Sequence, residues 1–286
     1  MGMGWQEWPL IVFTVFGQCV AGGIIIMGLA QIAGGLSERQ SQSLHRMMLV
    51  LWVLMGLAFV LSTMHLGSPF RALNSLYRLG SSGLSNEIGG GALFFAVGGI
   101  YWLLAVLGKM PRVLGNAWLL LTMALGLFFV YLMTRVYQID TVPTWNNGYT
   151  TLNFFLTVLL GGSALGVLLL RAAGLNVPGR RILSLLSIAG LLVAVCAVIL
   201  QTVALTGIHS SVQQASALIP WYGQLMVWRL LLIAIGLGCW IYPLARRNQA
   251  GLASIMLGCL LVVAGEVIGR GVFYGLHMTV GMAIAG

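Results

Sequence analysis

The sequence predicts an all-α integral membrane protein with eight transmembrane helices. Charged residues make up 7% of the 286 residues and hydrophobic residues 59%, whereas an ordinary soluble domain carries about 25% charged residues. The mean hydropathy is +1.00. Eight apolar runs are long enough to cross a bilayer, which takes about 20 residues of helix. Because hydrophobic residues do not alternate with a period of two, helices are favoured over the strands of a barrel.

The eight runs follow one another through a single membrane domain, residues 1–286. In chain order the predicted helices lie near 9–33, 46–65, 88–108, 115–136, 151–171, 181–206, 225–245 and 251–272. No Lys or Arg precedes the first run, so it lacks the basic segment of a cleaved signal peptide and is expected to be retained. No loop is long enough for a soluble catalytic domain. An arrangement in two four-helix halves stays open.

The basic residues predict how the helices are oriented. Nine of the fourteen Lys and Arg residues fall in odd-numbered loops: Arg39, Arg46, Lys109, Arg112, Arg171, Arg180, Arg181, Arg246 and Arg247. The positive-inside rule then places the odd loops in the cytoplasm and both termini in the periplasm. Tryptophans and tyrosines near the opposite helix ends agree with this. The net charge of +9 is largely this topological signal, so contact with membrane lipid is expected and nucleic-acid binding is not.

Small residues and cysteines favour helix packing over ligand binding. Gly162 and Gly166, like Gly265 and Gly269, stand four residues apart, a spacing that lets membrane helices approach closely. The four cysteines are scattered singly through apolar runs, without the paired spacing of a metal site. We therefore expect no metal site in this protein.

The densest collection of ionisable side chains lies between the second and third predicted helices. Glu87, one of only five acidic residues, follows His65, Arg71 and Arg78. Ionisable groups near a bilayer are costly, so such a cluster is a candidate functional site. His65 and Glu87 can each accept a proton near neutral pH, which suits the oxidation of a lipid-soluble hydroquinone.

Structural interpretations of these residues stay open. His65 can cap the end of the second helix. Ser85 or Asn86 can cap the third, which would leave Glu87 in a first turn that favours acidic side chains. Elsewhere, Glu266 and Arg270 are four residues apart and predict an ion pair within the last helix.

Several motifs, in order along the whole sequence, resemble the membrane-anchor family of dimethyl sulfoxide reductase. They are Gly4-Trp5-Gln6-Glu7-Trp8-Pro9-Leu10, His65-Leu66-Gly67-Ser68-Pro69, Arg71-Ala72, Asn74-Ser75-Leu76, Leu84-Ser85-Asn86-Glu87, Ile139-Asp140-Thr141-Val142-Pro143-Thr144-Trp145, Ile208-His209-Ser210-Ser211-Val212-Gln213-Gln214-Ala215 and Phe273-Tyr274-Gly275-Leu276-His277-Met278-Thr279-Val280-Gly281-Met282. The likeness is strongest to the paralogous, selenate-reductase-type anchor of enterobacteria.

The resemblance implies a haem-free anchor in the bacterial inner membrane that oxidises menaquinol at the periplasmic side during anaerobic respiration. Electrons would pass to a four-cluster iron–sulfur subunit and then to a molybdopterin catalytic subunit, which carries out the terminal reduction. The anchor itself would hold no iron–sulfur cluster or molybdenum. The family's quinol pocket would carry over to His65, Gly67, Arg71, Arg78 and Glu87, with His65 and Glu87 as the proton acceptors. Leu73 departs from the family, where an aromatic residue is expected at the pocket rim.

Two other classes of membrane protein stay open as alternatives. A b-type cytochrome quinol subunit needs axial histidines facing each other at suitable depth, whereas His65, His209 and His277 fall at predicted helix ends. A secondary transporter expects polar groups near the membrane midplane, and here they are predicted at the outer face. The identity of the terminal acceptor, whether dimethyl sulfoxide, an N-oxide or selenate, is set by another subunit.

Overall fold

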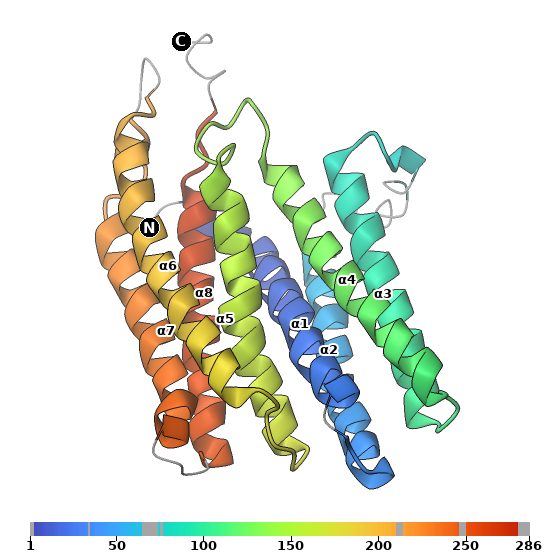
Figure 1. The fold of residues 1–286 in the computed structure, drawn as a ribbon. Coiled ribbons are helices and arrows are strands. Elements are labelled where there is room, and N and C mark those ends of the chain that lie inside the picture. The colour runs from blue at the N-terminus through green and yellow to red at the C-terminus, as the bar shows by residue number, and fades with distance from the viewer. Residues whose placement is uncertain are drawn as a thin grey trace.

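The computed structural model describes residues 3–33, 35–64, 74, 77–209, 214–245 and 250–279. Within them, eight helices are long and apolar enough to cross a membrane, which confirms the predicted fold class. In chain order the elements are η1 (Met3–Glu7), α1 (Trp8–Ala33), α2 (Glu38–Met64), α3 (Gly83–Val106), α4 (Arg112–Tyr137), α5 (Gly148–Ala172), α6 (Arg180–Thr206), η3 (Ala215–Ala217), α7 (Tyr222–Ala245) and α8 (Leu252–Gly275), as Figure 1 shows.

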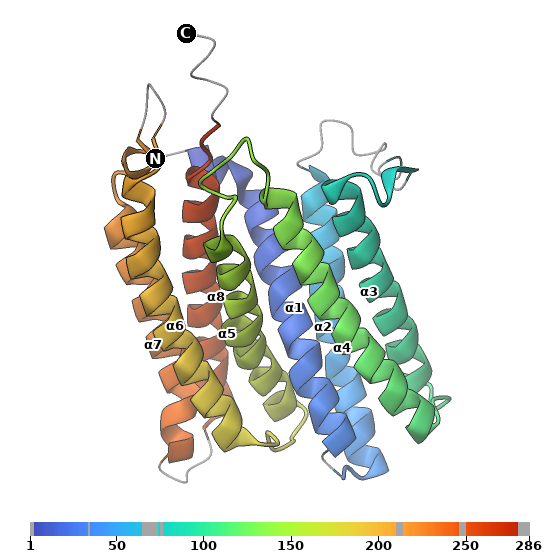
Figure 2. The same cartoon turned by 45° about the horizontal axis from the view of Figure 1, so that its top comes forward.

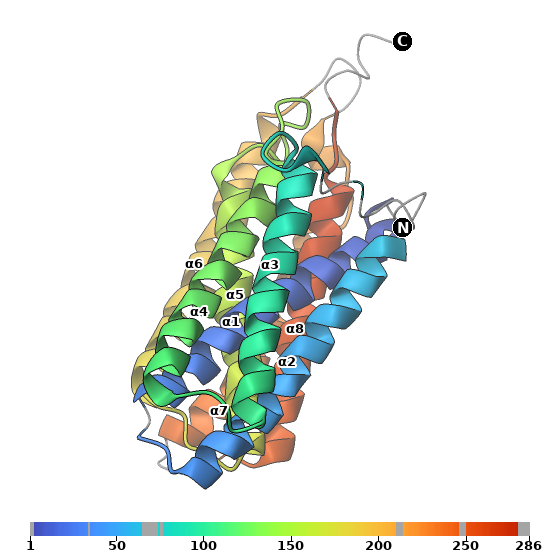
Figure 3. The ribbon, with the colours of Figure 1, turned by 90° about the vertical axis from the view of Figure 1, so that its right-hand side faces the viewer.

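The helices run up and down, so their ends gather at two ends of the bundle. We call the end that holds Trp8, Tyr137 and Gly275 the outer end, and the end that holds Ala33 and Arg180 the inner end. Figure 3 shows the turn before α3 at the same end as the start of α1 and the end of α8. The distribution of Lys and Arg predicts that the outer end is periplasmic.

Helices α1 and α5 form the interior of the bundle. They are more fully buried than the other spans, and α1 contacts α2, α4, α5 and α8. In Figures 1 and 2, α2–α4 lie on one side of this pair and α6–α8 lie on the other. The outward faces of the flanking helices carry exposed Leu, Ile and Val side chains, as expected for surfaces that contact lipid.

The close crossing of α1 and α5 depends on glycine. A Cβ atom on Gly22 would lie 2.7 Å from the Cα of Gly162, and one on Gly166 would lie 2.6 Å from the Cβ of Ile26. The two backbones therefore touch where no side chain intervenes. This confirms the prediction that Gly162 and Gly166 serve helix packing.

Candidate functional site

The start of α3 places Glu87 in the second turn of that helix. Ser82 is the N-cap, and its Oγ accepts a hydrogen bond from the Ser85 amide at 3.5 Å. The Oδ1 atom of Asn86 instead accepts from the Gly80 amide at 2.6 Å, which draws the preceding turn onto the helix. The expectation that Ser85 or Asn86 caps α3 is therefore wrong. The first turn holds no acidic residue, so a first-turn interaction does not explain Glu87.

The Glu87 side chain is buried, with only 3% of its surface exposed. Among the described residues, its Oε1 atom has no hydrogen-bond partner. Buried polar atoms are nearly always satisfied, and an exception calls for an explanation. In a membrane bundle the cost of such a group is high and its usual explanation is function. Such an unpaired carboxylate oxygen is a candidate proton acceptor.

An aromatic cluster lies one helical turn deeper than Glu87. A Cβ atom on Gly91 would come within 2.8 Å of both Phe59 and Phe129. The ring of Phe13 lies 5.8 Å from that of Phe59 and 6.1 Å from that of Phe129. Aromatic faces and edges pack well against a further flat ring. The unpaired oxygen of Glu87 thus lies one helical turn from a cluster of aromatic rings.

Two buried tyrosines connect this region to α8. The hydroxyls of Tyr137, at the end of α4, and Tyr274, near the end of α8, hydrogen-bond to each other. Glu87 and Arg270 are both close enough to these hydroxyls to interact with them electrostatically. The Tyr137 ring also packs edge-on against Trp145 and Phe273. Glu87 therefore belongs to an outer-end polar region built by both sides of the bundle.

A second set of polar side chains, here called the deep polar cluster, comprises the buried Gln18, Arg229, Glu266 and Arg270 and the half-buried Asn153. Glu266 Oε2 accepts from Arg229 Nη2 at 3.2 Å and from the hydroxyl of Thr157 at 2.9 Å. Arg270 donates to Gln18 Oε1 at 2.6 Å and stacks over the Phe154 ring at 3.7 Å.

The predicted ion pair between Glu266 and Arg270 is wrong. The carboxylate of Glu266 pairs with α7, because Gly265 and Gly269 leave room for Arg229 to reach across. A Cβ atom on Gly269 would lie 2.6 Å from Arg229 Nε. Arg270 turns instead toward α1. Helix spacing alone could not show that a cation on a neighbouring helix competes for the carboxylate.

The deep polar cluster lies further from the outer end than the sequence indicated. Glu266 stands nine residues before Gly275, the last residue of α8, which is about 14 Å along a helix axis, close to half of a hydrocarbon core of about 30 Å. A cavity of about 20 Å³ borders Asn153, Arg229 and Glu266, enough for one water. The expectation that polar groups stay at the outer face therefore holds for Glu87 but not for this cluster.

The other predicted site residues fare differently. Arg78 lies exposed in the turn before α3, and its carbonyl accepts from the amides of Ser81 and Ser82 at 3.1 Å. Arg78 and Glu87 form no ion pair with each other. The remaining predicted pocket residues, His65, Gly67 and Arg71, lie outside the described residues. The same holds for Leu73, the residue that departs from the family. Their roles stay predictions.

The three histidines within the described residues lie in separate places. His45 bonds the hydroxyl of Tyr101 at 3.0 Å near the inner end, while His277 lies against the Trp145 ring at the outer end. His209 is exposed beside Gln214. Among the described residues, no group of three or more His, Cys, Asp or Glu side chains could hold a metal ion.

Sequence reasoning missed the groups that surround the two buried carboxylates. Arg229 and Gln18 stand inside apolar runs, a signal that could have singled them out, since polar residues inside a spanning helix are rare. Tyr137 and Tyr274 gave no such signal, because tyrosines near helix ends are ordinary in membrane proteins.

Eight helices that are long and apolar enough to span a membrane, with buried ionisable side chains between them, define a polytopic membrane protein with a polar interior. The protein belongs to the DMSO reductase anchor subunit family, described as DmsC, whose family model matches residues 1–276. It is 56% identical over 286 residues to YnfH, a subunit of an anaerobic dimethyl sulfoxide reductase of Escherichia coli, and the alignment covers the full length of both proteins.

Two further relatives are also aligned over the full length of both proteins. Identity is 53% over 286 residues to the C subunit of the anaerobic dimethyl sulfoxide reductase of Escherichia coli. It is 43% over 296 residues to the subunit of the same name from Haemophilus influenzae. These relatives confirm the resemblance that the motifs indicated.

Proposed function

We propose that this protein is the menaquinol-oxidising anchor of a dimethyl sulfoxide reductase-type complex in the bacterial inner membrane. The observation that carries the proposal is Glu87, a buried carboxylate with an unpaired oxygen beside an aromatic cluster at one end of the bundle. A naphthoquinol presents flat apolar rings and two hydroxyl groups. The aromatic cluster suits the flat rings of the quinol, and the unpaired oxygen of Glu87 suits one of its hydroxyl groups.

Menaquinol supplies two electrons and two protons when it is oxidised. In this proposal Glu87 Oε1 accepts one hydroxyl proton and His65, from the segment that precedes α3, accepts the other. A buried base close to the reacting hydroxyl is the arrangement that general base catalysis requires. Arg71 and Arg78 position the ring oxygens or the partner subunit, and Gly67 belongs to the same proposed pocket.

The proposed electron acceptor is a four-cluster iron–sulfur subunit, followed by a molybdopterin catalytic subunit. Membership of the anchor family supports such partners. Glu87 lies four residues from the start of α3, about 6 Å along the helix axis. A quinol at this depth is close to the outer surface, where an iron–sulfur protein docked over residues 66–87 could receive its electrons.

Substitution of Glu87 by Gln tests the proposal. Gln keeps the size of the side chain but cannot take up a proton at this position. We expect quinol-driven reduction of the terminal acceptor to fall by about 10²-fold, and His65→Ala to have a similar effect. Reduction driven by a dye that feeds the soluble subunits directly should stay unchanged.

Two results would contradict this assignment. An unchanged quinol-driven rate in the assembled Glu87→Gln complex would place the pocket elsewhere. An equal loss of quinol-driven and dye-driven activity would show that Glu87 serves assembly. Glu38→Gln provides the matched control, since Glu38 is an exposed glutamate at the inner end.

A further inference from the structure

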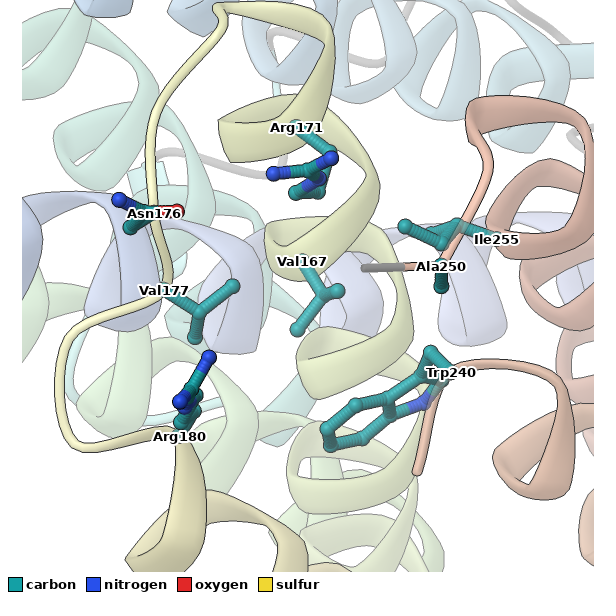
Figure 4. A pocket seen from close by; sticks show the side chains of 8 residues that line it. All are labelled: Val167, Arg171, Asn176, Val177, Arg180, Trp240, Ala250 and Ile255. Atoms are coloured by element: carbon teal, nitrogen blue, oxygen red, sulfur yellow. The ribbon is translucent and has the colours of Figure 1, made fainter. Parts of the chain in front are cut away.

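A basic groove lies at the inner end of the bundle, far from Glu87. Its open part, of about 660 Å³, is lined by Asn176, Gly179, Arg180 and Arg181. It continues into a smaller cavity of about 40 Å³ that Arg171 and Trp240 border. Figure 4 shows Arg171 of α5 and Arg180 of α6 on different sides of this cavity, with Trp240 of α7 along another.

The first turn of α6 adds positive potential to the groove. Its N-cap is Gly179, whose φ of 58° lies in the left-handed region and which has no side chain to bond the first amides. The first amides of a 27-residue helix are left without an intrahelical partner and carry the positive end of the helix dipole. Arg180 and Arg181, both exposed, extend from this same turn.

The protein supplies almost no negative charge near this groove. No Asp or Glu occurs between Asp140 and Glu266, so α5, α6, α7 and the loops between them contribute no carboxylate. The neighbouring cavity at the inner end is different, because Glu38 and Arg112 both line it. An anion from outside the protein is therefore the fitting partner for the groove on α5 and α6.

A buried donor at the bottom of the groove also lacks a partner. The Trp240 side chain is only 1% exposed, and no described residue accepts a hydrogen bond from its indole N–H. An unsatisfied buried donor costs about 1–3 kcal/mol. Trp240 borders the smaller cavity, so an unsatisfied polar group lies beside the part of the groove that the arginines surround.

The surface below the arginines is apolar and faces outward. Ile182 and Leu185 of α6 are 65% and 67% exposed. Ile182 follows Arg181 directly and Leu185 stands four residues after it, so both lie on the side that membrane lipid would contact. A cationic rim above a lipid-facing apolar stripe matches the two parts of a glycerophospholipid, and basic pockets between membrane helices bind such head groups.

We propose that this groove binds the phosphate of an anionic membrane phospholipid. Arg180, Arg181 and the first amides of α6 contact the phosphate. The acyl chains lie along Ile182 and Leu185. The site is separate from the proposed quinol site and does not depend on it.

Lipid retention by the purified complex tests this proposal. The delipidated complex in neutral detergent would receive phosphatidylglycerol or phosphatidylcholine with identical acyl chains, and native mass spectrometry would measure the bound fraction. We expect the wild type to favour phosphatidylglycerol. Arg180→Gln with Arg181→Gln should lower phosphatidylglycerol retention at least about tenfold. Lys109→Gln with Arg112→Gln, the same charge change at another inner loop, should leave it unchanged.

Other outcomes would overturn the proposal. Displacement by millimolar inorganic phosphate, with no preference between the two lipids, would define a free phosphate site. Equal retention of both lipids, insensitive to phosphate, would indicate an apolar groove alone. An equal loss in the control variant would indicate general surface charge.

A wild-type measurement covers the case in which the double variant does not assemble. Phosphatidylglycerol with a photoreactive head group should cross-link to residues 171–182. Cross-links that map only to other segments would contradict the site.

Discussion

The buried glutamates differ in how their charge is accommodated. Glu266 Oε2 accepts from the guanidinium of Arg229 and the hydroxyl of Thr157, so the protein itself balances that carboxylate. Within the part of the chain that the structure describes, the Oε1 atoms of Glu87 and Glu266 both lack a hydrogen-bond partner, but of these two carboxylates only Glu266 is paired with a cation. A paired carboxylate is typical of a structural role, whereas an unpaired one is open to a proton or a ligand. This contrast is why we assign quinol chemistry to Glu87 and not to the deep polar cluster.

Substitution at Glu266 should therefore lower stability. Glu266→Gln leaves Arg229, itself only 5% exposed, without its counter-charge. Removing one member of a buried pair typically costs about 3–5 kcal/mol. Unfolding by SDS in mixed micelles would measure the loss, with the exposed Glu38→Gln as the control. Equal stability of the two variants would show that the pair is not needed for the fold.

At the scale of helices, close backbone contact takes the place that large apolar side chains hold in soluble proteins. Lipid tails are as apolar as leucine, so burying leucine gains little in a membrane, and tight van der Waals packing drives association. The crossing of Gly22 on α1 with Gly162 on α5 brings together the two most buried spans. That crossing holds the two sides of the bundle against each other.

Gly162→Ala should weaken this crossing. The added Cβ would lie 2.7 Å from the carbonyl carbon of Gly22, too close without a shift of one helix, and overpacking of this kind costs about 1–3 kcal/mol. Gly99→Ala is the matched control, because a Cβ on that helical glycine meets nothing within 4 Å. It should be neutral or slightly stabilising, since Ala favours helix over Gly. Unfolding by SDS in mixed micelles would compare the stability of the two variants. An equal loss of stability in both would contradict the packing argument.

For the whole molecule, the number and order of the helices could be predicted from sequence because the bilayer allows few solutions. Every backbone polar group must be satisfied within the span, so each long apolar run becomes a helix. The start of α3 could not be placed, because the bond from the Gly80 amide to Asn86 depends on how the preceding turn folds back. The partners of Glu266 and Arg270 depend on which helices pack together, which periodicity does not encode.

The orientation of the whole molecule is the prediction on which both proposed sites depend. With both termini in the periplasm, the Glu87 end faces the periplasm, and the groove of Arg180 and Arg181 meets the inner leaflet, where anionic head groups attract basic residues. A reporter that is active only in the cytoplasm should be silent after Gly286 and active after Asn176. The physical reason is the concentration of Lys and Arg at the inner end. The sequence placed Arg39 and Arg46 in a loop, whereas both lie in the first turns of α2, at that same end of the bundle. The reverse pattern would put the quinol end, and the docked iron–sulfur subunit, in the cytoplasm.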